Sequence, residues 1–172
     1  FALMPFFRAE PSHTPRHLSE GKQFEFEMGF FEDWREVMDL QEACLKFMLS
    51  YLHEKCGEEI EQLGGIVAAP EDVPFPRITF QEAQELFFQL TGIDERQEPD
   101  LSPRAERELC KYAFEKYGTD FIFITDWKTE KRPFYAYPTD GNPKLSNTFD
   151  LLCAGTEITS GGQRRHTFDS MV

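Results

Sequence analysis

Residues 149–166 read FDLLCAGTEITSGGQRRH and give the clearest indication of the fold class. They contain two short segments rich in apolar and β-branched residues, separated by Gly155, which is typical of two strands joined by a turn. Two more segments of this kind precede them, TDFIFIT at 119–125 and RPFYAYP at 132–138. We therefore expect an antiparallel sheet in the C-terminal part of the chain.

The N-terminal residues contain a second pair of strand-like segments. FALMPFF at 1–7 and FEFEMGFF at 24–31 are rich in apolar residues, and a polar loop with two prolines joins them. This pattern predicts a strand, a long loop and a strand. Because helices lie between these strands and the C-terminal ones, we expect an α+β fold, an antiparallel β-sheet flanked by helices. Pairing of the N-terminal hairpin with the C-terminal strands would complete that sheet.

A long helix is expected directly after the hairpin. Asp33 and Glu36 have the spacing of a capping box, and Gly57 is a typical residue at a helix end. Apolar residues follow between them at helical spacing, which predicts an amphipathic helix that covers the sheet. These apolar positions are Val37, Leu40, Cys44, Phe47, Met48 and Tyr51.

Two shorter helices are expected in the middle of the chain. The sequence TFQE at 79–82 is a second capping-box pattern, and this helix should end near Gly92. The pair Ser-Pro at 102–103 fits the N-cap and first turn of another helix, which should end near Gly118. Residues 58–77 contain several glycines and prolines and are expected to be a connection, with a short helix at its beginning.

Composition limits the classes of function. The 172 residues have 40% hydrophobic content, enough for one sizeable core, and a single globular unit is expected. The net charge of −13 works against sequence-independent binding of phosphate backbones. No apolar run approaches the roughly 20 residues of a membrane span, and the cysteine spacing fits neither a metal site nor a dense disulfide framework. We therefore expect a cytoplasmic protein with no membrane partner and with reduced, buried cysteines.

Charged residues gather at the end of the first strand and in the loop after it. Arg8 and Glu10 lie on one face of an extended strand, and the loop can bring Arg16 and His17 over that face. Because arginine binds phosphate oxygens bidentately, this arrangement suits a polyphosphate. On composition alone a solvated salt-bridge cluster is the stronger interpretation, since charged strand faces are usually only hydrated.

A second group of polar residues lies in TEITSGGQRRH at 156–166, with Asp150 shortly before it. The carboxylate of Glu157 and the hydroxyl of Ser160 can share a hard cation such as nucleotide-bound Mg²⁺, and Arg164 can pair with a substrate carboxylate. The two glycines after the serine would let a ligand approach the backbone. On spacing alone, a glycine-containing β-bulge with ordinary flanking charges explains the segment at least equally well.

Both groups lie in segments that resemble known motifs. FFRAE at 6–10, followed by HTPRHLSE at 13–20, resembles motif 2 of the class II aminoacyl-tRNA synthetases. Residues 149–166 resemble the segment before motif 3 in aspartyl enzymes of archaeal and eukaryotic type, and RPFYAYP and GNPKLSNTFDLL are similar to the same subfamily. The resemblance covers most of the chain and is weakest at 58–100. It implies part of a class II synthetase catalytic domain.

The resemblance also implies how the chain is divided. Residues 1–31 would be the motif 2 hairpin, 33–118 a mainly helical segment and 119–172 the antiparallel strands before motif 3, all within a single, incomplete catalytic domain over 1–172. Motif 1 with its homodimer interface, the OB-fold that reads the anticodon, and motif 3 would lie in a longer parent protein. A tRNA would be bound through those parts, and this chain alone would be inactive.

The resemblance implies that ATP and Mg²⁺ bind along these two motifs. Arg8 would contact the α-phosphate and Glu10 the adenine side, while Glu157 and Ser160 would hold Mg²⁺ on the phosphates. Such a site needs no general base, because the substrate carboxylate is itself the nucleophile, and catalysis is alignment plus charge neutralisation. The implied ATP-binding residues are Arg8, Ala9, Glu10, Arg16, His17, Leu18 and Glu157.

The amino-acid side of the implied site consists of Ser160, Arg164 and Glu25, with Arg164 on the side-chain carboxylate or amide oxygen. Glu25 stands where aspartyl enzymes usually carry Asp and asparaginyl enzymes Glu, and a longer acid can accept hydrogen bonds from an amide. The RPFY and GTEITSGGQR sequences are closer to aspartyl enzymes, so aspartate is the first choice over asparagine. Gly21 stands where many relatives have an aromatic residue under the adenine.

Four functions are open on the sequence. The first is an aspartate–tRNA(Asp/Asn) ligase, and the second is an asparaginyl-tRNA synthetase. The third is an asparagine synthetase descended from this subfamily, which would use the same adenylate without tRNA. The fourth is a noncatalytic synthetase-like module that binds partners or ligands.

Overall fold

The computed structural model describes residues 1–9, 18–65 and 67–171. They form two compact units, Phe1–Asp33 and Trp34–Val172. The first unit contains β1 (Ala2–Phe7) and β2 (Glu20–Glu25). The second contains α1 (Glu36–Gln62), β3 (Arg77–Thr79), α2 (Phe80–Thr91), α3 (Pro103–Tyr117), β4 (Phe121–Thr125), the 3₁₀ helix η1 (Thr129–Lys131), β5 (Pro138–Thr139), β6 (Asn142–Ser146), β7 (Thr148–Cys153), β8 (Thr156–Gly162) and α4 (Phe168–Met171). The α+β class is confirmed, and a single domain over the whole chain stays a prediction.

The first unit is an antiparallel hairpin of β1 and β2, with Ala2 opposite Glu25. The order of strand, loop and strand is as expected. The second strand, however, begins at Glu20 rather than at Phe24 and ends at Glu25. Main-chain hydrogen bonds set this register, and they form whether or not the side chains are apolar. Pairing of the hairpin with the C-terminal strands stays a prediction.

The second unit is built on a four-stranded sheet in the order β3-β4-β7-β8. β4 pairs antiparallel with β7, and β7 with β8, as the strand patterns predict. β3 was not expected, and it is parallel to β4, so this sheet is mixed rather than wholly antiparallel. The chain passes through α2 and α3 between β3 and β4, and such a helical crossover is what parallel neighbours require.

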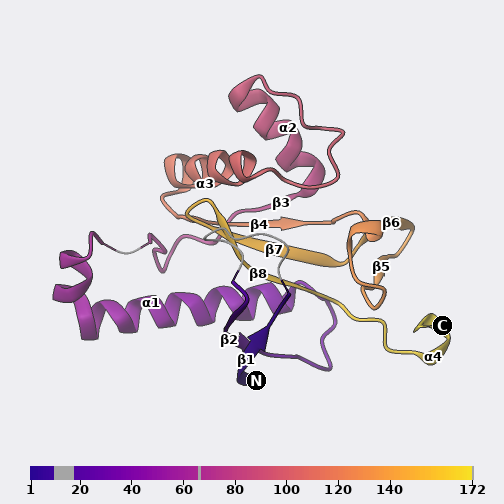
Figure 1. Cartoon of the computed structure of the whole chain (residues 1–172), viewed down its shortest axis with the longest axis horizontal. Coiled ribbons are helices and arrows are strands. Elements are labelled where there is room, and N and C mark those ends of the chain that lie inside the picture. The colour runs from indigo at the N-terminus through magenta and orange to yellow at the C-terminus, as the bar shows by residue number, and fades with distance from the viewer. Residues whose placement is uncertain (10–17, 66, 172) are drawn as a thin grey trace. The chain divides into compact units, whose positions relative to one another are not determined.

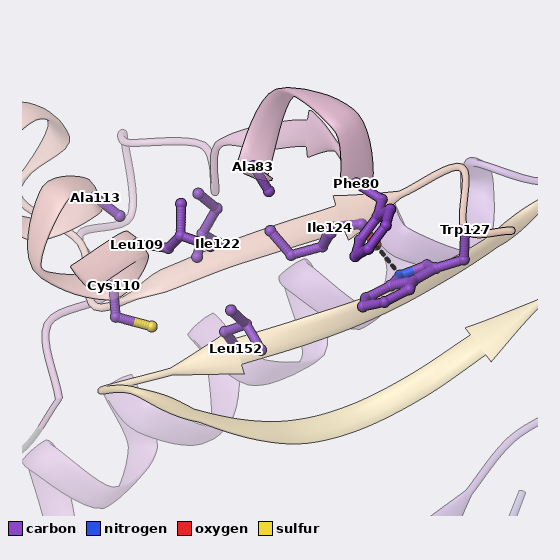
Figure 2. Close-up of a cluster of buried hydrophobic side chains, with 9 residues drawn as sticks. All are labelled: Phe80, Ala83, Leu109, Cys110, Ala113, Ile122, Ile124, Trp127 and Leu152. Carbon is purple, nitrogen blue, oxygen red and sulfur yellow. Dashed lines mark hydrogen bonds between the residues drawn. The ribbon is translucent and has the colours of Figure 1, made fainter. Parts of the chain in front are cut away.

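Strand β4 separates two layers of the core. Its sequence FIFIT is buried at every position, so alternate side chains enter opposite layers. Figure 1 shows α2 and α3 along one face of the sheet and α1 along the other. On the second face, Phe75 stacks on Phe121 with 4.4 Å between ring centroids. The cluster on the α2–α3 face comprises Phe80, Ala83, Leu109, Cys110, Ala113, Ile122, Ile124, Trp127 and Leu152 (Figure 2).

The two short helices begin and end where the sequence predicts. The Thr79 hydroxyl accepts a hydrogen bond from the backbone N–H of Glu82, and the Glu82 carboxylate accepts one from the backbone N–H of Thr79. Ser102 caps α3 in the same way, through a 3.1 Å bond from the backbone three residues on. Gly92 and Gly118 end the two helices in the left-handed conformation. Local capping therefore fixes both helices.

The long helix α1 differs from the prediction at its start. Its N-cap is Arg35, which makes no side-chain capping bond, so the helix begins two residues later than the cap expected at Asp33. Backbone hydrogen bonds in the turn that precedes the helix take the place of the side-chain cap. The expected end near Gly57 is confirmed as a kink, because Cys56 has non-helical dihedral angles and divides α1 into a long helix and a short one that continues to Gln62. A break of this kind beside a glycine agrees with the weak helix propensity of that residue.

The apolar stripe of α1 does not cover the sheet as expected. Leu40, Phe47, Met48 and Tyr51 are exposed by 47%, 71%, 46% and 51%. The buried face carries Met38, Gln41 and Glu42 instead. The Glu42 carboxylate accepts a hydrogen bond from the backbone N–H of Phe75 at 3.1 Å, and Lys46 donates to the carbonyl of Val73 at 2.8 Å. The backbone of residues 71–75 thus needs polar partners on this face, and periodicity alone does not reveal that need.

Residues 132–138 do not form the expected strand. They follow η1 and contain a turn closed by the N–H of Ala136 and the carbonyl of Pro133, at 2.9 Å. Only Pro138 belongs to a strand, the short β5. Two prolines remove backbone donors from this segment, and before β5 its only strand-like pairing among the described residues is the bridge between Ala136 and Arg164.

The four cysteines are all free, as expected, but only Cys110 is buried. Desolvation raises the pKa of Cys110 to about 11 and that of Cys153 to about 12. Both thiols are therefore protonated at neutral pH and have little nucleophilic character. Over the described part of the chain, no helix combines the length and the apolar character needed to cross a membrane.

Candidate functional site

A β-bulge between β7 and β8 shapes the candidate site. Asp150 lies opposite Ser160, Leu152 lies opposite Glu157, and the register shifts between these pairs. In a regular strand, residues three apart point to opposite faces, so Glu157 and Ser160 would be separated. The extra residue, Ile158, corrects this offset and places both on the face that carries Asp150. The bulge thus brings a hydroxyl and two carboxylates together.

Asp150 is buried, with 4% of its surface exposed, and pairs with Arg132. Arg132 Nη2 donates to Asp150 Oδ2 at 2.7 Å, and the guanidinium carbon lies 4.5 Å from the ring centroid of Trp127. The second oxygen, Asp150 Oδ1, is buried without a hydrogen-bond partner. Burial raises the pKa of Asp150, and the bond to Arg132 opposes that rise. An unpaired buried carboxylate oxygen is costly unless a ligand supplies a cation or a donor.

Glu157 keeps much of its surface exposed, but the surrounding protein desolvates its carboxyl group. This desolvation, followed by repulsion from Asp150, raises the pKa of Glu157 to about 7. Arg132 acts in the opposite direction, while Glu106 and Asp100 add to the rise. A cation bound between the two carboxylates would lower the pKa of both.

Arg164 follows β8 and is held beside the segment after η1. The N–H of Tyr137 donates to the carbonyl of Gln163 at 2.9 Å, and the N–H of Arg165 donates to the carbonyl of Tyr135 at 2.8 Å. The guanidinium carbon of Arg164 lies 4.9 Å from the ring centroid of Tyr135. Arg164 is exposed, so it is oriented by the ring and still accessible to an anionic group.

The two glycines of β8 serve strand packing rather than ligand approach. A Cβ on Gly161 would lie 2.5 Å from the ring of Phe149, and a Cβ on Gly162 would lie 2.6 Å from the carbonyl oxygen of Asn147. Protein atoms therefore already occupy the space that the absence of side chains creates. Close packing of β7 on β8 thus already accounts for both glycines, and approach of a ligand to this backbone stays a prediction.

Arg8 lies just beyond β1 in the first unit. Its N–H donates to the carbonyl of Ser19 at 2.8 Å, which extends the hairpin by one residue. Its guanidinium carbon lies 5.4 Å from the ring centroid of Phe6. That ring also lies across Gly21 on the paired strand, where a Cβ would come within 2.6 Å of it. Phe6 thus provides an aromatic surface beside the position where Gly21 provides none.

The other hairpin residues of the predicted site are on the surface. Ala9 and Leu18 are exposed beside the loop, and Glu25 is exposed at the end of β2, where its carboxylate accepts a hydrogen bond from Gln23 Nε2. The predicted site residues Glu10, Arg16 and His17 lie outside the described residues. The structure therefore brings Glu157 and Ser160 to one face of the sheet in the second unit, with Arg164 after the end of β8 in the same unit. Arg8, Ala9, Leu18 and Glu25 belong to the first unit.

The fit to Mg²⁺ rests on few protein ligands. Across residues 1–9, 18–65 and 67–171, no group of three or more His, Cys, Asp or Glu could hold a metal ion. Mg²⁺ is usually held by one or two carboxylates together with phosphates and water. Asp150, Glu157 and the Ser160 hydroxyl fit that type of site, and the unpaired Oδ1 of Asp150 is the observation that supports it.

Two further residues contribute to the site without any signal in the sequence. Arg132 and Tyr135 lie in the segment RPFYAYP, whose pattern predicts a strand and no chemical role. Their contacts with Asp150 and Arg164 depend on the turn after η1, and residue spacing gives no signal of that turn. Asp150 is a candidate from the sequence, but its position on the same face as Glu157 depends on the bulge, which the sequence does not predict.

Comparison with known proteins identifies one family, the class that the sequence motifs resemble. The family model described as tRNA synthetases class II (D, K and N) matches residues 1–172. Aspartate–tRNA(Asp/Asn) ligase of Thermus thermophilus is 40% identical over 173 residues, which is 100% of this chain and 40% of that protein. Aspartate–tRNA(Asp) ligase of Pyrococcus horikoshii is 38% identical over 100% of this chain and 39% of its own length. The chain thus spans about 40% of the length of these curated relatives.

Solved structures show the same fold. The aspartyl tRNA synthetase from Entamoeba histolytica superposes with a TM-score of 0.86 at 32% identity, covering 98% of this chain and 35% of that one. The asparaginyl-tRNA synthetase from Pyrococcus horikoshii complexed with asparaginyl-adenylate gives a TM-score of 0.82 at 28% identity, covering 98% and 38%. With a family match over its full length, this chain belongs to the class II tRNA synthetases of the D, K and N group.

Proposed function

We propose that the protein to which this chain belongs is an aspartate–tRNA(Asp/Asn) ligase, which activates aspartate with ATP and transfers it to tRNA. The observation that carries this proposal is the bulged pair β7–β8, where Asp150, Glu157 and Ser160 share one face, together with the family match over residues 1–172. The names of the curated relatives support aspartate as the amino acid.

The proposed chemistry has two steps. In the first, a carboxylate oxygen of the amino acid attacks the α-phosphorus of ATP, the bond to the bridging oxygen breaks, and pyrophosphate leaves. In the second, a terminal ribose hydroxyl of tRNA attacks the acyl carbon, the bond to AMP breaks, and the hydroxyl proton passes to the leaving phosphate or to water. The attacking carboxylate is already anionic, so the first step depends on alignment and on neutralisation of phosphate charge.

The residues proposed to bind ATP come from the two motifs that resemble those of class II synthetases. Arg8 would bind the α-phosphate, with Ala9 and Glu10 on the adenine side and Arg16, His17 and Leu18 over the triphosphate. Phe6 is our candidate for the aromatic surface under the adenine, because its ring lies across Gly21. Mg²⁺ would neutralise phosphate charge when held by Glu157 and Ser160, with Asp150 as a further ligand.

The amino acid is proposed to bind through Arg164, Ser160 and Glu25. A guanidinium pairs with a side-chain carboxylate bidentately, which favours aspartate. The longer side chain of Glu25 can accept hydrogen bonds from an amide group, which favours asparagine, so asparaginyl-tRNA synthetase is the second candidate. The longer parent protein is proposed to be a cytoplasmic homodimer that binds tRNA through segments outside this chain.

Amino-acid-dependent exchange of pyrophosphate into ATP, followed by charging of tRNA, tests the proposal on the full-length protein. Aspartate-dependent exchange with charging of tRNA supports the aspartate ligase. Asparagine-dependent exchange with charging identifies an asparaginyl-tRNA synthetase instead. Exchange with aspartate that yields free asparagine in the presence of ammonia, without charging, identifies an asparagine synthetase. Absence of exchange with either amino acid refutes catalysis and leaves a noncatalytic module.

A further inference from the structure

Resting on the proposed function, we propose that residues 132–135 position both ends of the β7–β8 site, with Arg132 fixing the Asp150 carboxylate and Tyr135 fixing the Arg164 guanidinium. Neither residue needs to touch substrate. Each is a positioning residue that acts through the group it holds.

Arg132 orients Asp150 through one oxygen only. The bond from Nη2 to Oδ2 measures 2.7 Å, while Oδ1 of the same carboxylate is buried and unpaired. A carboxylate bonded through one oxygen is anchored at that oxygen, and its second oxygen keeps its capacity to bind a cation or a donor. Because Ser160 lies directly opposite Asp150 on β8, the Asp150 side chain belongs to the face that also carries Glu157.

The Arg132 side chain is itself immobilised by an aromatic ring. Its guanidinium carbon lies 4.5 Å from the centroid of Trp127, and only 15% of its side chain is exposed. The indole of Trp127 is fixed in turn by a 3.1 Å hydrogen bond from Nε1 to the carbonyl of Ile124, visible in Figure 2, and by stacking on Phe80 at 4.5 Å. The core cluster on the α2–α3 face thus extends through Trp127 and Arg132 to Asp150.

Tyr135 orients the Arg164 guanidinium, as Arg132 orients the Asp150 carboxylate. The ring supports the guanidinium at 4.9 Å, and the backbone bond from Arg165 N–H to the Tyr135 carbonyl fixes the spacing of the two segments. The turn closed between Pro133 and Ala136 links this contact to Arg132. One short segment therefore sets the orientation of a carboxylate and a guanidinium on different parts of the sheet.

The test measures ligand binding by calorimetry on the full-length protein, with two titrations. The first titrates Mg²⁺ at fixed ATP and gives the Mg²⁺ midpoint for ATP binding. The second titrates aspartate and asparagine. A wild-type protein that binds neither ATP with Mg²⁺ nor either amino acid refutes the proposed function itself, before any variant is considered.

Arg132→Met is expected to raise the Mg²⁺ midpoint about 10-fold to 100-fold, the usual effect of removing a partner that orients a metal ligand, while amino-acid affinity stays within about 2-fold. Lys131→Met removes an exposed positive charge next to it and should leave the midpoint unchanged. Arg132→Lys should give an intermediate midpoint, because an ammonium group does not stack as a planar fork. If Arg132→Met does not fold, a wild-type midpoint in Arg132→Lys overturns this part of the proposal.

Tyr135→Leu is expected to weaken amino-acid binding about 2-fold to 5-fold, the value of one exposed cation–π contact, with the Mg²⁺ midpoint unchanged. Tyr135→Phe keeps the ring and should bind as wild type does, and Phe134→Leu is the control for loss of a neighbouring exposed ring. The opposite result is a wild-type affinity in Tyr135→Leu, or equal loss of both ligands in the Arg132 and Tyr135 variants. Equal loss would mean that the segment supports the fold without orienting either group.

Discussion

Replacing Gly162 by Ala should separate β7 from β8. A Cβ at this position would lie 2.6 Å from the carbonyl oxygen of Asn147 and 2.8 Å from the Cα of Thr148, both backbone atoms that cannot turn aside. Overpacking of this kind costs about 3 kcal/mol at the upper end of its usual range. The displacement would also strain the 2.9 Å bond between the N–H of Gln163 and the carbonyl of Asn147, adding about 1 kcal/mol.

Gly162→Ala is therefore expected to lower the free energy of unfolding by about 4 kcal/mol. This is a large share of the roughly 5–15 kcal/mol by which a typical domain is stable. Urea denaturation of the chain, followed by the fluorescence of Trp34 and Trp127, measures it. The control is Gly57→Ala in α1, where no atom lies within 4 Å of the added Cβ and helix propensity should add up to about 1 kcal/mol. A Gly162→Ala variant within about 1 kcal/mol of wild type would refute the close approach of the two strands.

Three further predictions concern the site and the helix that follows β3. Asp150→Ala leaves Arg132 buried without its counter-charge and should cost about 3–5 kcal/mol in urea denaturation, and a loss below about 1 kcal/mol would contradict a buried pair. Glu157 has a folded-state pKa of about 7, above its ordinary 4.5, so the folded chain binds more protons than the unfolded chain between these values. Stability from this group is thus complete below pH 4.5 and is lost as the pH rises through 7, and Glu157→Gln should flatten the dependence of the urea midpoint on pH across that window. Thr79→Ala removes the capping box of α2 and should cost about 1 kcal/mol by the same assay, while an unchanged midpoint would mean that tertiary packing alone fixes the start of the helix.

The elements that the sequence predicts best are those fixed by local interactions. Thr79 and Ser102 cap their helices by accepting hydrogen bonds from the backbone three residues further on, a spacing that the sequence itself displays. The alternation of FIFIT likewise predicts β4. For α1 the same reasoning selects the wrong face, because Glu42 and Lys46 turn toward backbone groups that lie more than 25 residues further along the chain.

The candidate site is predictable in its members but not in its geometry. Glu157, Ser160 and Arg164 stand out by residue type, yet spacing places the first two on opposite faces of a regular strand. The bulge at Ile158 adds one residue to β8 and so brings Glu157 and Ser160 to the same face. A bulge depends on how two strands pair, and the sequence of one strand does not determine that pairing.

Pyrophosphate exchange into ATP tests the central claim most directly when the full-length wild type is compared with Glu157→Gln. The account predicts exchange that depends on aspartate in the wild type, and a loss of at least about 100-fold in the variant, because phosphate charge is no longer neutralised at the bulged pair. Exchange that persists undiminished in Glu157→Gln would contradict the role given to β7 and β8. Absence of exchange in the wild type with either aspartate or asparagine would contradict amino-acid activation itself.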